Sequence, residues 1–518
     1  MPPSETPNQA AIDPQTQTEL AGKLHWLVLS LIVVLGIAAR LGCLACKPFW
    51  FDECFSVEAA RIDWSNFLHL LWWREANMSL YYALLRIWLH FGQSPFFIRS
   101  LSVAISAASL PALYWLGHLL YNRRVALYAT ALLAINVYDV RYAQEARTYA
   151  LFVLLATLSS GFLVAWLRQP TPRNWRGYVG ASVFAAYAHF YALLLLIAHW
   201  LVLRWVGKPE ASSREGESAK TSLKRAWTVI AVSVLPLLIF VAKTGAGPIH
   251  WIQRPRLSDL LRFSSDLTNG LPMLYLAACV LALLPSQRNL LARDQKWETW
   301  RVQFLCIWLV FPIVLTVVLS LARPVFLPRY MTFCIPALLT LTAAGLGSIR
   351  PAWLSGLTLI VVFALSARMV PYVYGHDFDA ERDASGAATS FVLDHSQPGD
   401  AIVFHIAAAR VPYEFFRSLR AGTNTASPQF TPPLGPDILF PRHGPGLDYR
   451  DFTGKPTAGF VRTAIAGHRR IWLLLMHNGT AEEPDPTTRM LSEVLEGTFP
   501  SVRRWQFPKV EVRLYSQE

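Results

Sequence analysis

Apolar residues fall in long runs over the first 370 positions. These runs are 24–46, 97–120, 125–140, 149–167, 177–188, 190–206, 226–243, 271–284, 304–322, 330–347 and 352–370. About 20 apolar residues cross the ~30 Å hydrocarbon core of a bilayer. The pattern therefore predicts about eleven transmembrane helices, of which those at 177–188 and 271–284 are the shortest.

Two other parts of the chain have different patterns. The segment SLYYALLRIWLHF at 79–91 is too short to span, and we interpret it as an amphipathic helix at the outer membrane interface. Beyond residue 370 no spanning run occurs. AIVFH, RIWLLLMH and VEVRLYS predict strands, whereas 378–396 and MLSEVLEG predict helices. This alternation is typical of a small α/β domain.

The pattern divides the chain into three parts. Residues 1–22 are polar and predict a disordered tail. Residues 23–370 form a mostly α-helical, polytopic membrane domain, and residues 371–518 form the α/β domain.

Charge adds an orientation to this division. Only 16% of the residues are charged, against about 25% in soluble proteins, and the net charge is +13. The basic residues gather in the loops around 123–124, 168–176, 204–225, 288–301 and 350, which fits the positive-inside rule. With eleven spans, the tail is cytoplasmic and the α/β domain lies outside. The positive charge is explained by topology, so we expect membrane lipids as partners and no nucleic acid.

The six cysteines give no sign of a metal site. Cys43 and Cys46 form a CxxC pair, but no second pair completes a zinc set. We interpret all six as small apolar residues in or beside helices.

An acidic pair follows the first run directly, in PFWFDECFSVEAAR at 48–61. Asp52 and Glu53 are surrounded by aromatic residues at the level of the lipid head groups. An acid near a membrane is costly and usually has a function. In an extended segment neighbouring side chains point in opposite directions, so one carboxylate can face a site while the other anchors the loop. The alternative is an ordinary solvated pair.

A second candidate stretch is YDVRYAQEARTYALF at 138–152. Arg141 and Glu145 have helical i, i+4 spacing and are expected to pair, with Tyr142 beside them as a supporting residue. Arg147 is then left to bind a phosphate. Arginines on an outer loop act against the positive-inside bias, which favours a functional role for them.

Two further outward loops hold candidate residues. LARPVFLPRYMTF contains Arg329 and Tyr330, and guanidinium is suited to phosphate oxygens. The alternative is an arginine that snorkels to the head groups. His189 lies at the turn between two apolar runs, where it can bind phosphate or a metal, or satisfy a helix end.

At these residues the chain resembles the membrane glycosyltransferases of the GT-C fold. The resemblance is to bacterial relatives of protein O-mannosyltransferases and of the lipid A aminoarabinose transferase (glycosyltransferase family 39-like). It rests on FDECFS at 51–56, ANMSLYYALLRIWLHFGQSPFFIRSLS at 76–102, YAQEARTYAL at 142–151 and RPVFLPRYMTFCIPALL at 323–339. The second motif has Met78-Ser79 in place of the usual Pro pair. The resemblance covers about residues 24–370.

The resemblance implies a hexosyl- or pentosyltransferase that uses a polyprenyl-phosphate sugar donor. Transfer would invert the sugar and occur at the outer face of a bacterial inner membrane, onto a hydroxyl of a protein, glycolipid or polysaccharide. Asp52 would be the general base with Glu53 as its supporting neighbour, and Arg147 and Arg329 would bind the lipid phosphate.

Two questions stay open at this point. Glu145 could orient Arg147 or join a metal site, because some relatives bind a divalent ion, although this chain has no metal signature of its own. A transporter or flippase for a phosphate-bearing lipid is the alternative function. That alternative needs ionisable residues near the middle of the bilayer, whereas the charges here gather at one face.

Overall fold

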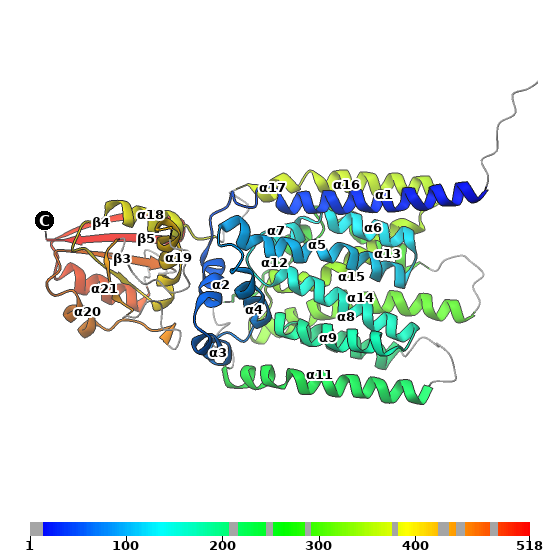
Figure 1. Ribbon diagram of the computed structural model, residues 1–518, viewed down its shortest axis with the longest axis horizontal. Helices are drawn as coiled ribbons and strands as arrows, with labels where there is room; N and C mark the ends of the chain where they lie inside the picture. The colour runs from blue at the N-terminus through cyan, green and yellow to red at the C-terminus, as the bar shows by residue number, and fades with distance from the viewer. Residues whose placement is uncertain are drawn as a thin grey trace, which may run out of the picture.

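The computed structural model describes most of the 518-residue chain. The described residues are 14–206, 216–244, 252–284, 292–375, 382–422, 435–441, 451–476 and 485–517. They form a helical bundle and an α/β domain at one end of that bundle (Figure 1).

Seven helical stretches of the described residues are long and apolar enough to cross a membrane. They are α1 (Pro14–Leu41), α5 (Pro95–Leu120), α8 (Tyr149–Arg168), α11 (Gly216–Thr244), α14 (Ala292–Ala322), η3 (Pro328–Cys334) with α15 (Ile335–Ser348), and α16 (Ala352–Ala367) with α17 (Val370–Tyr374). The helices run side by side in Figure 1. The chain is therefore an integral membrane protein.

Shorter helices account for the other predicted runs. They are α6 (Arg123–Ala134), α9 (Pro172–Ala188), α10 (Ala192–Leu201) with η1 (Val202–Val206), and α13 (Pro272–Leu283). α12 (Leu257–Leu267) and α13 meet at a bend of 72° and give an eighth span if they are counted as one. All eleven predicted runs are thus helical, but four of these helices are at or below the shortest length that spans alone.

Four short helices lie on the connections at the end of the bundle that faces the α/β domain (Figure 1). They are α2 (Phe51–Arg61), α3 (Trp64–Trp73), α4 (Ser79–Trp88) and α7 (Val137–Ala143). α4 confirms the short amphipathic helix, because it buries Tyr81, Tyr82 and Leu85 on one side. The extended segment predicted for Asp52 and Glu53 is wrong, since both lie in the first turn of α2.

The α/β domain contains one five-stranded sheet with the order β2-β1-β3-β5-β4. Its strands are β1 (Ala401–Phe404), β2 (Asp437–Phe440), β3 (Arg470–Met476), β4 (Ser501–Phe507) and β5 (Val510–Ser516). β1 pairs in parallel with β2 and β3, whereas β5 pairs antiparallel with β3 and β4. The accompanying helices are α18 (Ser385–His395), η5 (Ala407–Ala409), α19 (Arg410–Arg420), α20 (Ala458–Ala464) and α21 (Pro486–Glu496).

Two sequence-based expectations change at the N-terminal end. Residues 14–22, expected in the disordered tail, belong to α1, because good helix formers such as Gln, Glu and Leu extend the apolar helix. Residues 1–13 of that tail lie outside the described residues. Cys43 and Cys46 are not separate apolar residues but form a disulfide, since the turn after α1 brings their Cα atoms to 5.1 Å.

Candidate active site between the bundle and the α/β domain

Asp52 lies at the centre of a charged cluster. Its Oδ2 atom is 3.6 Å from Arg147 Nη2 and 3.8 Å from Arg329 Nη2. The side chain keeps 19% of its surface exposed, whereas those of the two arginines keep 10% and 13%. The structure therefore brings together one accessible carboxylate and two largely buried guanidinium groups from three separate segments.

Arg147 lies in the connection between α7 and α8. Its Nη1 atom donates to the hydroxyl groups of Tyr82 at 3.3 Å and Ser56 at 3.4 Å, and to the Asp52 carbonyl at 3.4 Å. Burial opposes its charge, but the neighbouring Asp52 carboxylate outweighs this and raises the pKa of Arg147. Arg147 is thus a permanent buried cation, although it is not left unpaired as the sequence suggested.

Arg329 and Tyr330 enter the cluster from η3. The Arg329 guanidinium lies 5.6 Å from the centre of the Trp50 ring, within range of a cation–π interaction. The Tyr330 ring lies 4.6 Å from His189 and 5.2 Å from Tyr191. These contacts hold Arg329 and Tyr330 at the cluster.

His189 follows α9 and is completely buried. Its Nδ1 atom accepts from the Tyr191 amide at 3.2 Å, so this assignment places the hydrogen on Nε2. Burial, together with the charges of Arg147 and Arg329, lowers the pKa of His189 to about 3. The ring is therefore neutral at physiological pH, with its Nε2 hydrogen available to a ligand.

Several buried donors of this cluster have no hydrogen-bond partner among the residues that the structure describes. They include Arg147 Nε, the Tyr149 hydroxyl and His189 Nε2. The Tyr149 and His189 rings are 6.5 Å apart, and Arg147 interacts electrostatically with both residues. Buried polar groups are rarely left unsatisfied in folded proteins. Such a group of donors is suited to an anionic ligand.

Glu53 has a different environment from its neighbour Asp52. Its side chain is completely buried, and its oxygens accept from Arg99 Nε and Nη2 at 2.8 and 2.7 Å, from Arg382 at 3.0 Å and from the Ala146 amide at 3.0 Å. Burial alone would raise the pKa of Glu53, but Arg99 and Arg382 lower it. Glu53 therefore anchors α2, whereas Asp52 faces the cluster.

The residues that bind Glu53 also contact two other segments, the turn closed by the Cys43–Cys46 disulfide and the stretch YAQEAR at 142–147. Arg99 also donates to the carbonyl groups of Leu44 and Lys47, each at 2.8 Å, on either side of Cys46. Glu145 lies beyond the end of α7, so it does not share a helix with Arg141, and it forms an ion pair with Arg382 at 3.2 Å.

Arg141 and Tyr142 lie at the end of α7, beside the cluster. The Arg141 guanidinium is 5.4 Å from the centre of the Tyr142 ring, which in turn lies 4.9 Å from the Tyr149 ring. Tyr142 is thus connected to the unsatisfied donors through Tyr149.

Sequence reasoning missed four residues of this region: Arg99, Arg382, Asp383 and Glu75. Arg99 carried a signal, because a charge at the start of an apolar run is costly and needs a partner. Arg382 and Asp383 belong to the stretch ERD at 381–383, but no role could be assigned to them from the local sequence, since their partners are over 200 residues away in the chain. Glu75 interacts with Arg147 and Asp52. Burial raises its pKa from the ordinary 4.5 to about 7, which Arg147 opposes and Asp52 increases.

Glu75 makes a pH-dependent contribution to stability. The folded protein holds its proton more tightly than the unfolded chain, so the stabilisation is complete below about pH 4.5 and is lost as the pH rises to about 7. One pKa unit corresponds to about 1.4 kcal/mol, so we expect at most about 3 kcal/mol. Thermal unfolding in detergent, compared between wild type and Glu75→Gln across this range, measures the difference.

The exposed Glu493 provides the control for that comparison. Glu493→Gln should follow the wild-type curve throughout. A wild-type advantage over Glu75→Gln that grows with pH would contradict the raised pKa of Glu75.

The described residues contain no group of three or more His, Cys, Asp or Glu side chains that could hold a metal ion. The cluster around Asp52 has two carboxylates, Asp52 and Glu75, beside two arginines. The chemistry of these residues favours an anion over a cation as ligand.

Comparisons with known proteins identify the fold. No family model matches the sequence, and no curated protein matches it. The structure is similar to ArnT from Cupriavidus metallidurans in the apo state, with a TM-score of 0.60 and 12% identity over 96% of this chain and 99% of that chain. The same protein bound to undecaprenyl phosphate gives a TM-score of 0.60 and 13% identity over 94% and 98%.

A second similar structure comes from an archaeon. It is the oligosaccharyltransferase AglB from Archaeoglobus fulgidus in complex with an inhibitory peptide and a dolichol-phosphate. Its TM-score is 0.50, with 9% identity over 87% of this chain and 69% of that chain. The membrane bundle with its attached domain thus has the architecture that the motifs implied, and the chain has the GT-C fold.

Proposed function

We propose that this protein transfers a sugar from a polyprenyl-phosphate donor to a hydroxyl of an acceptor, with inversion at the sugar carbon. The observation that carries the proposal is the arrangement of Asp52 beside Arg147 and Arg329, with unsatisfied donors on Arg147, Tyr149 and His189. One carboxylate beside several anion-binding groups is what such a reaction requires.

Each group has a role in this reaction. The acceptor hydroxyl attacks the anomeric carbon and gives its proton to Asp52, while the bond from that carbon to the phosphate oxygen breaks. The lipid phosphate leaves with an added negative charge. Arg147 and Arg329 stabilise this charge, and His189 and Tyr330 donate to the phosphate oxygens. Glu53 takes no part in the proton transfer because its oxygens are occupied within the protein.

The similar structures support a polyprenyl phosphate as the lipid. ArnT was solved with undecaprenyl phosphate and AglB with a dolichol-phosphate. The basic loops of this chain favour a site on the outer face of a bacterial inner membrane, with the α/β domain on the same side. The acceptor is then a protein, a glycolipid or a cell-envelope polysaccharide at that face.

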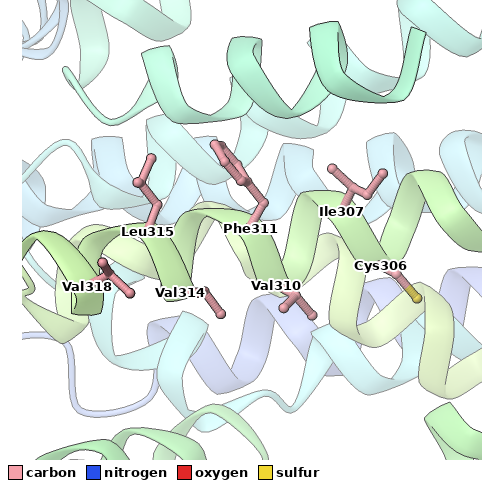
Figure 2. A pocket seen from close by; sticks show the side chains of 7 residues that line it. All are labelled: Cys306, Ile307, Val310, Phe311, Val314, Leu315 and Val318. Atoms are coloured by element: carbon pink, nitrogen blue, oxygen red, sulfur yellow. The ribbon is translucent and has the colours of Figure 1, made fainter. Parts of the chain in front are cut away.

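An apolar groove on α14 offers a place for the polyprenyl chain. The groove has a volume of about 500 Å³, and its lining includes Val310, Phe311, Val314 and Val318 (Figure 2). The three valines are each at least half exposed, as expected for a surface in contact with lipid. α14 packs against η3, where Trp308 Nε1 donates to the Phe333 carbonyl at 3.0 Å. A lipid lying along α14 would therefore extend toward the helix that carries Arg329.

The proposed function is tested by mass spectrometry of lipids from cells that lack the protein. A polyprenyl-phosphate sugar should accumulate in these cells, return to its normal level with wild type, and stay high with Arg147→Ala, which loses a cation from the phosphate site. Arg504→Ala is the matched control, since Arg504 is 53% exposed in an ion pair far from the cluster in sequence. If no such lipid changes in any of the cells, the transferase assignment fails and a lipid transporter is favoured.

A further inference from the structure

The α/β domain contributes two side chains to the helix that carries Asp52. α2 begins at Phe51, and its own N-cap residue, Trp50, provides no side-chain hydrogen bond. Instead, Oδ2 of Asp383 accepts from the Phe51 amide at 2.8 Å. The first amides of a helix have no partner within the helix, so an acidic side chain at this place fixes where the helix starts.

Asp383 is itself held rigidly. It is 3% exposed, and its Oδ1 atom accepts from the Ser385 amide at 3.2 Å and from the Ser385 hydroxyl. Ser385 is the first residue of α18 and also contacts Met476, the last residue of β3, at 3.7 Å. The cap on α2 is therefore connected directly to the sheet of the α/β domain.

Arg382, the preceding residue, binds the same region from another side. Its Nη1 atom contacts Oε2 of Glu53 at 3.0 Å and the Pro48 carbonyl at 3.2 Å, and its Nη2 atom contacts Oε1 of Glu145 at 3.2 Å. Its guanidinium also lies 5.7 Å from the centre of the Trp50 ring. One arginine thus joins the start of α2 to the segment that leads into Arg147.

Aromatic packing extends this contact along α2. Phe49 stacks on Phe415 of α19 with 5.0 Å between ring centres, and Phe55 lies 5.3 Å from Phe452. Phe51 packs against the apolar core of the α/β domain. The start of α2 is therefore fixed between the bundle and the domain.

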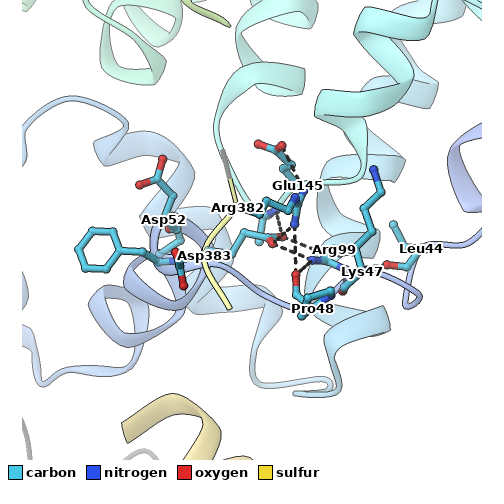
Figure 3. Close-up of polar contacts among 12 residues, drawn as sticks. Leu44, Lys47, Pro48, Asp52, Arg99, Glu145, Arg382 and Asp383 are labelled. Carbon is cyan, nitrogen blue, oxygen red and sulfur yellow. Dashed lines mark hydrogen bonds and ion pairs between the residues drawn. The ribbon is translucent and has the colours of Figure 1, made fainter. Parts of the chain in front are cut away.

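Asp52 lies between the two residues that are held most tightly. Phe51 is bound by Asp383, and Glu53 is bound by Arg99 and Arg382. In Figure 3 the Asp52 side chain points away from the ion pairs around Arg382 and Arg99. Its distances of 3.6 and 3.8 Å to the two arginines of the cluster depend on the position of α2. A displacement of about 1 Å at a reacting group can lower a rate by about 10²-fold.

We propose that Arg382 and Asp383 are positioning residues for the sugar-transfer reaction, through which the α/β domain holds α2 so that Asp52 faces Arg147 and Arg329. This inference rests on the proposed function. The domain is then a working part of the active site rather than an attachment to it, and any movement of the domain would be transmitted to the general base.

The test uses the full-length protein with Arg382→Ala and Asp383→Ala. Membranes from cells that lack the protein supply the accumulated lipid sugar. The rate at which each purified variant consumes this lipid should be about 10²-fold lower than that of wild type. Affinity for undecaprenyl phosphate in nanodiscs should stay within about twofold of wild type, because the phosphate-binding residues are unchanged. Arg420→Ala is the matched control, since Arg420 forms an exposed ion pair with Asp394 in the same domain.

Conservative variants separate positioning from folding. Asp383→Asn keeps an oxygen for the Phe51 amide and should restore most of the rate, whereas Arg382→Lys cannot bridge Glu53 and Glu145 and should stay slow. If the alanine variants do not fold, these two variants still test whether Arg382 and Asp383 position α2. A wild-type rate in folded Asp383→Ala, or in Arg382→Lys, overturns the proposal.

Hydrogen exchange distinguishes a failure of this inference from a failure of the proposed function. Amides 51–56 should exchange faster in Asp383→Ala than in wild type, whether or not the protein transfers a sugar. If wild type consumes no lipid sugar, the proposed function fails. Faster exchange in Asp383→Ala would still show that Asp383 holds the start of α2. Unchanged exchange in Asp383→Ala would show that Asp383 does not hold the start of α2, which overturns the inference.

Discussion

Asp52→Asn is expected to remove sugar transfer while leaving the protein folded. Asparagine has nearly the same shape, and its side-chain oxygen can still face Arg147 and Arg329, but it cannot take up the proton of the attacking hydroxyl. General-base catalysis contributes about 10²–10⁴-fold to a rate, so a loss of this size is expected. Asp52 is partly exposed, and its ion pairs with Arg147 and Arg329 are 3.6 and 3.8 Å long, against 2.7 Å for Glu53 with Arg99, so its neutralisation should cost much less stability than that of Glu53.

The measurement is the consumption of the accumulated polyprenyl-phosphate sugar by purified wild type and Asp52→Asn. Asp63→Asn is the matched control, because Asp63 lies on the same connection and caps α3 through the Ser65 and Asn66 amides, which asparagine also does well. Turnover near the wild-type rate in Asp52→Asn would exclude Asp52 as the base. Glu75 would then be the next carboxylate of the cluster to replace.

Local patterns predicted the apolar helices of the bundle and three of the five strands. The apolar runs correspond to helices, and the apolar segments after residue 400 correspond to β1, β3 and β5. β4 was missed because its sequence SVRRWQF is mostly exposed, as is common for a charged strand at the edge of a sheet. β2 was missed because only four residues form it and only one of them is buried.

The candidate site was predicted in part, and for a definite reason. Asp52, Arg147 and Arg329 could be chosen one by one, because each is a charge beside an apolar run. The separation of Asp52 from Glu53 into two environments was also expected, but from an extended segment, whereas the structure places both residues in the first turn of a helix. That separation depends on the helical start of α2, which is fixed by Asp383 and Arg382 more than 300 residues away. A nonlocal cap of this kind leaves no trace in the local pattern.

Glu53→Gln is expected to destabilise the protein strongly, in contrast to the change at the adjacent residue. Glu53 is completely buried and pairs with Arg99, whose side chain is only 1% exposed. A neutral glutamine leaves this buried guanidinium without a counter-charge and loosens Arg382 as well. Removing one partner of a buried ion pair costs about 3–5 kcal/mol. Low yield and early unfolding are therefore expected.

Thermal unfolding in detergent measures this loss, with Glu496→Gln as the control. Glu496 and Arg504 form an ion pair whose side chains are 45% and 53% exposed, and such pairs contribute about 1 kcal/mol or less. The unfolding temperature of Glu53→Gln should lie far below that of wild type, whereas those of Asp52→Asn and Glu496→Gln should lie close to the wild-type value. A Glu53→Gln protein that is as stable as wild type but inactive would show that Glu53 acts in the chemistry, and the division between the two carboxylates would then be wrong. The two substitutions together thus decide which neighbour takes the proton and which one holds the helix.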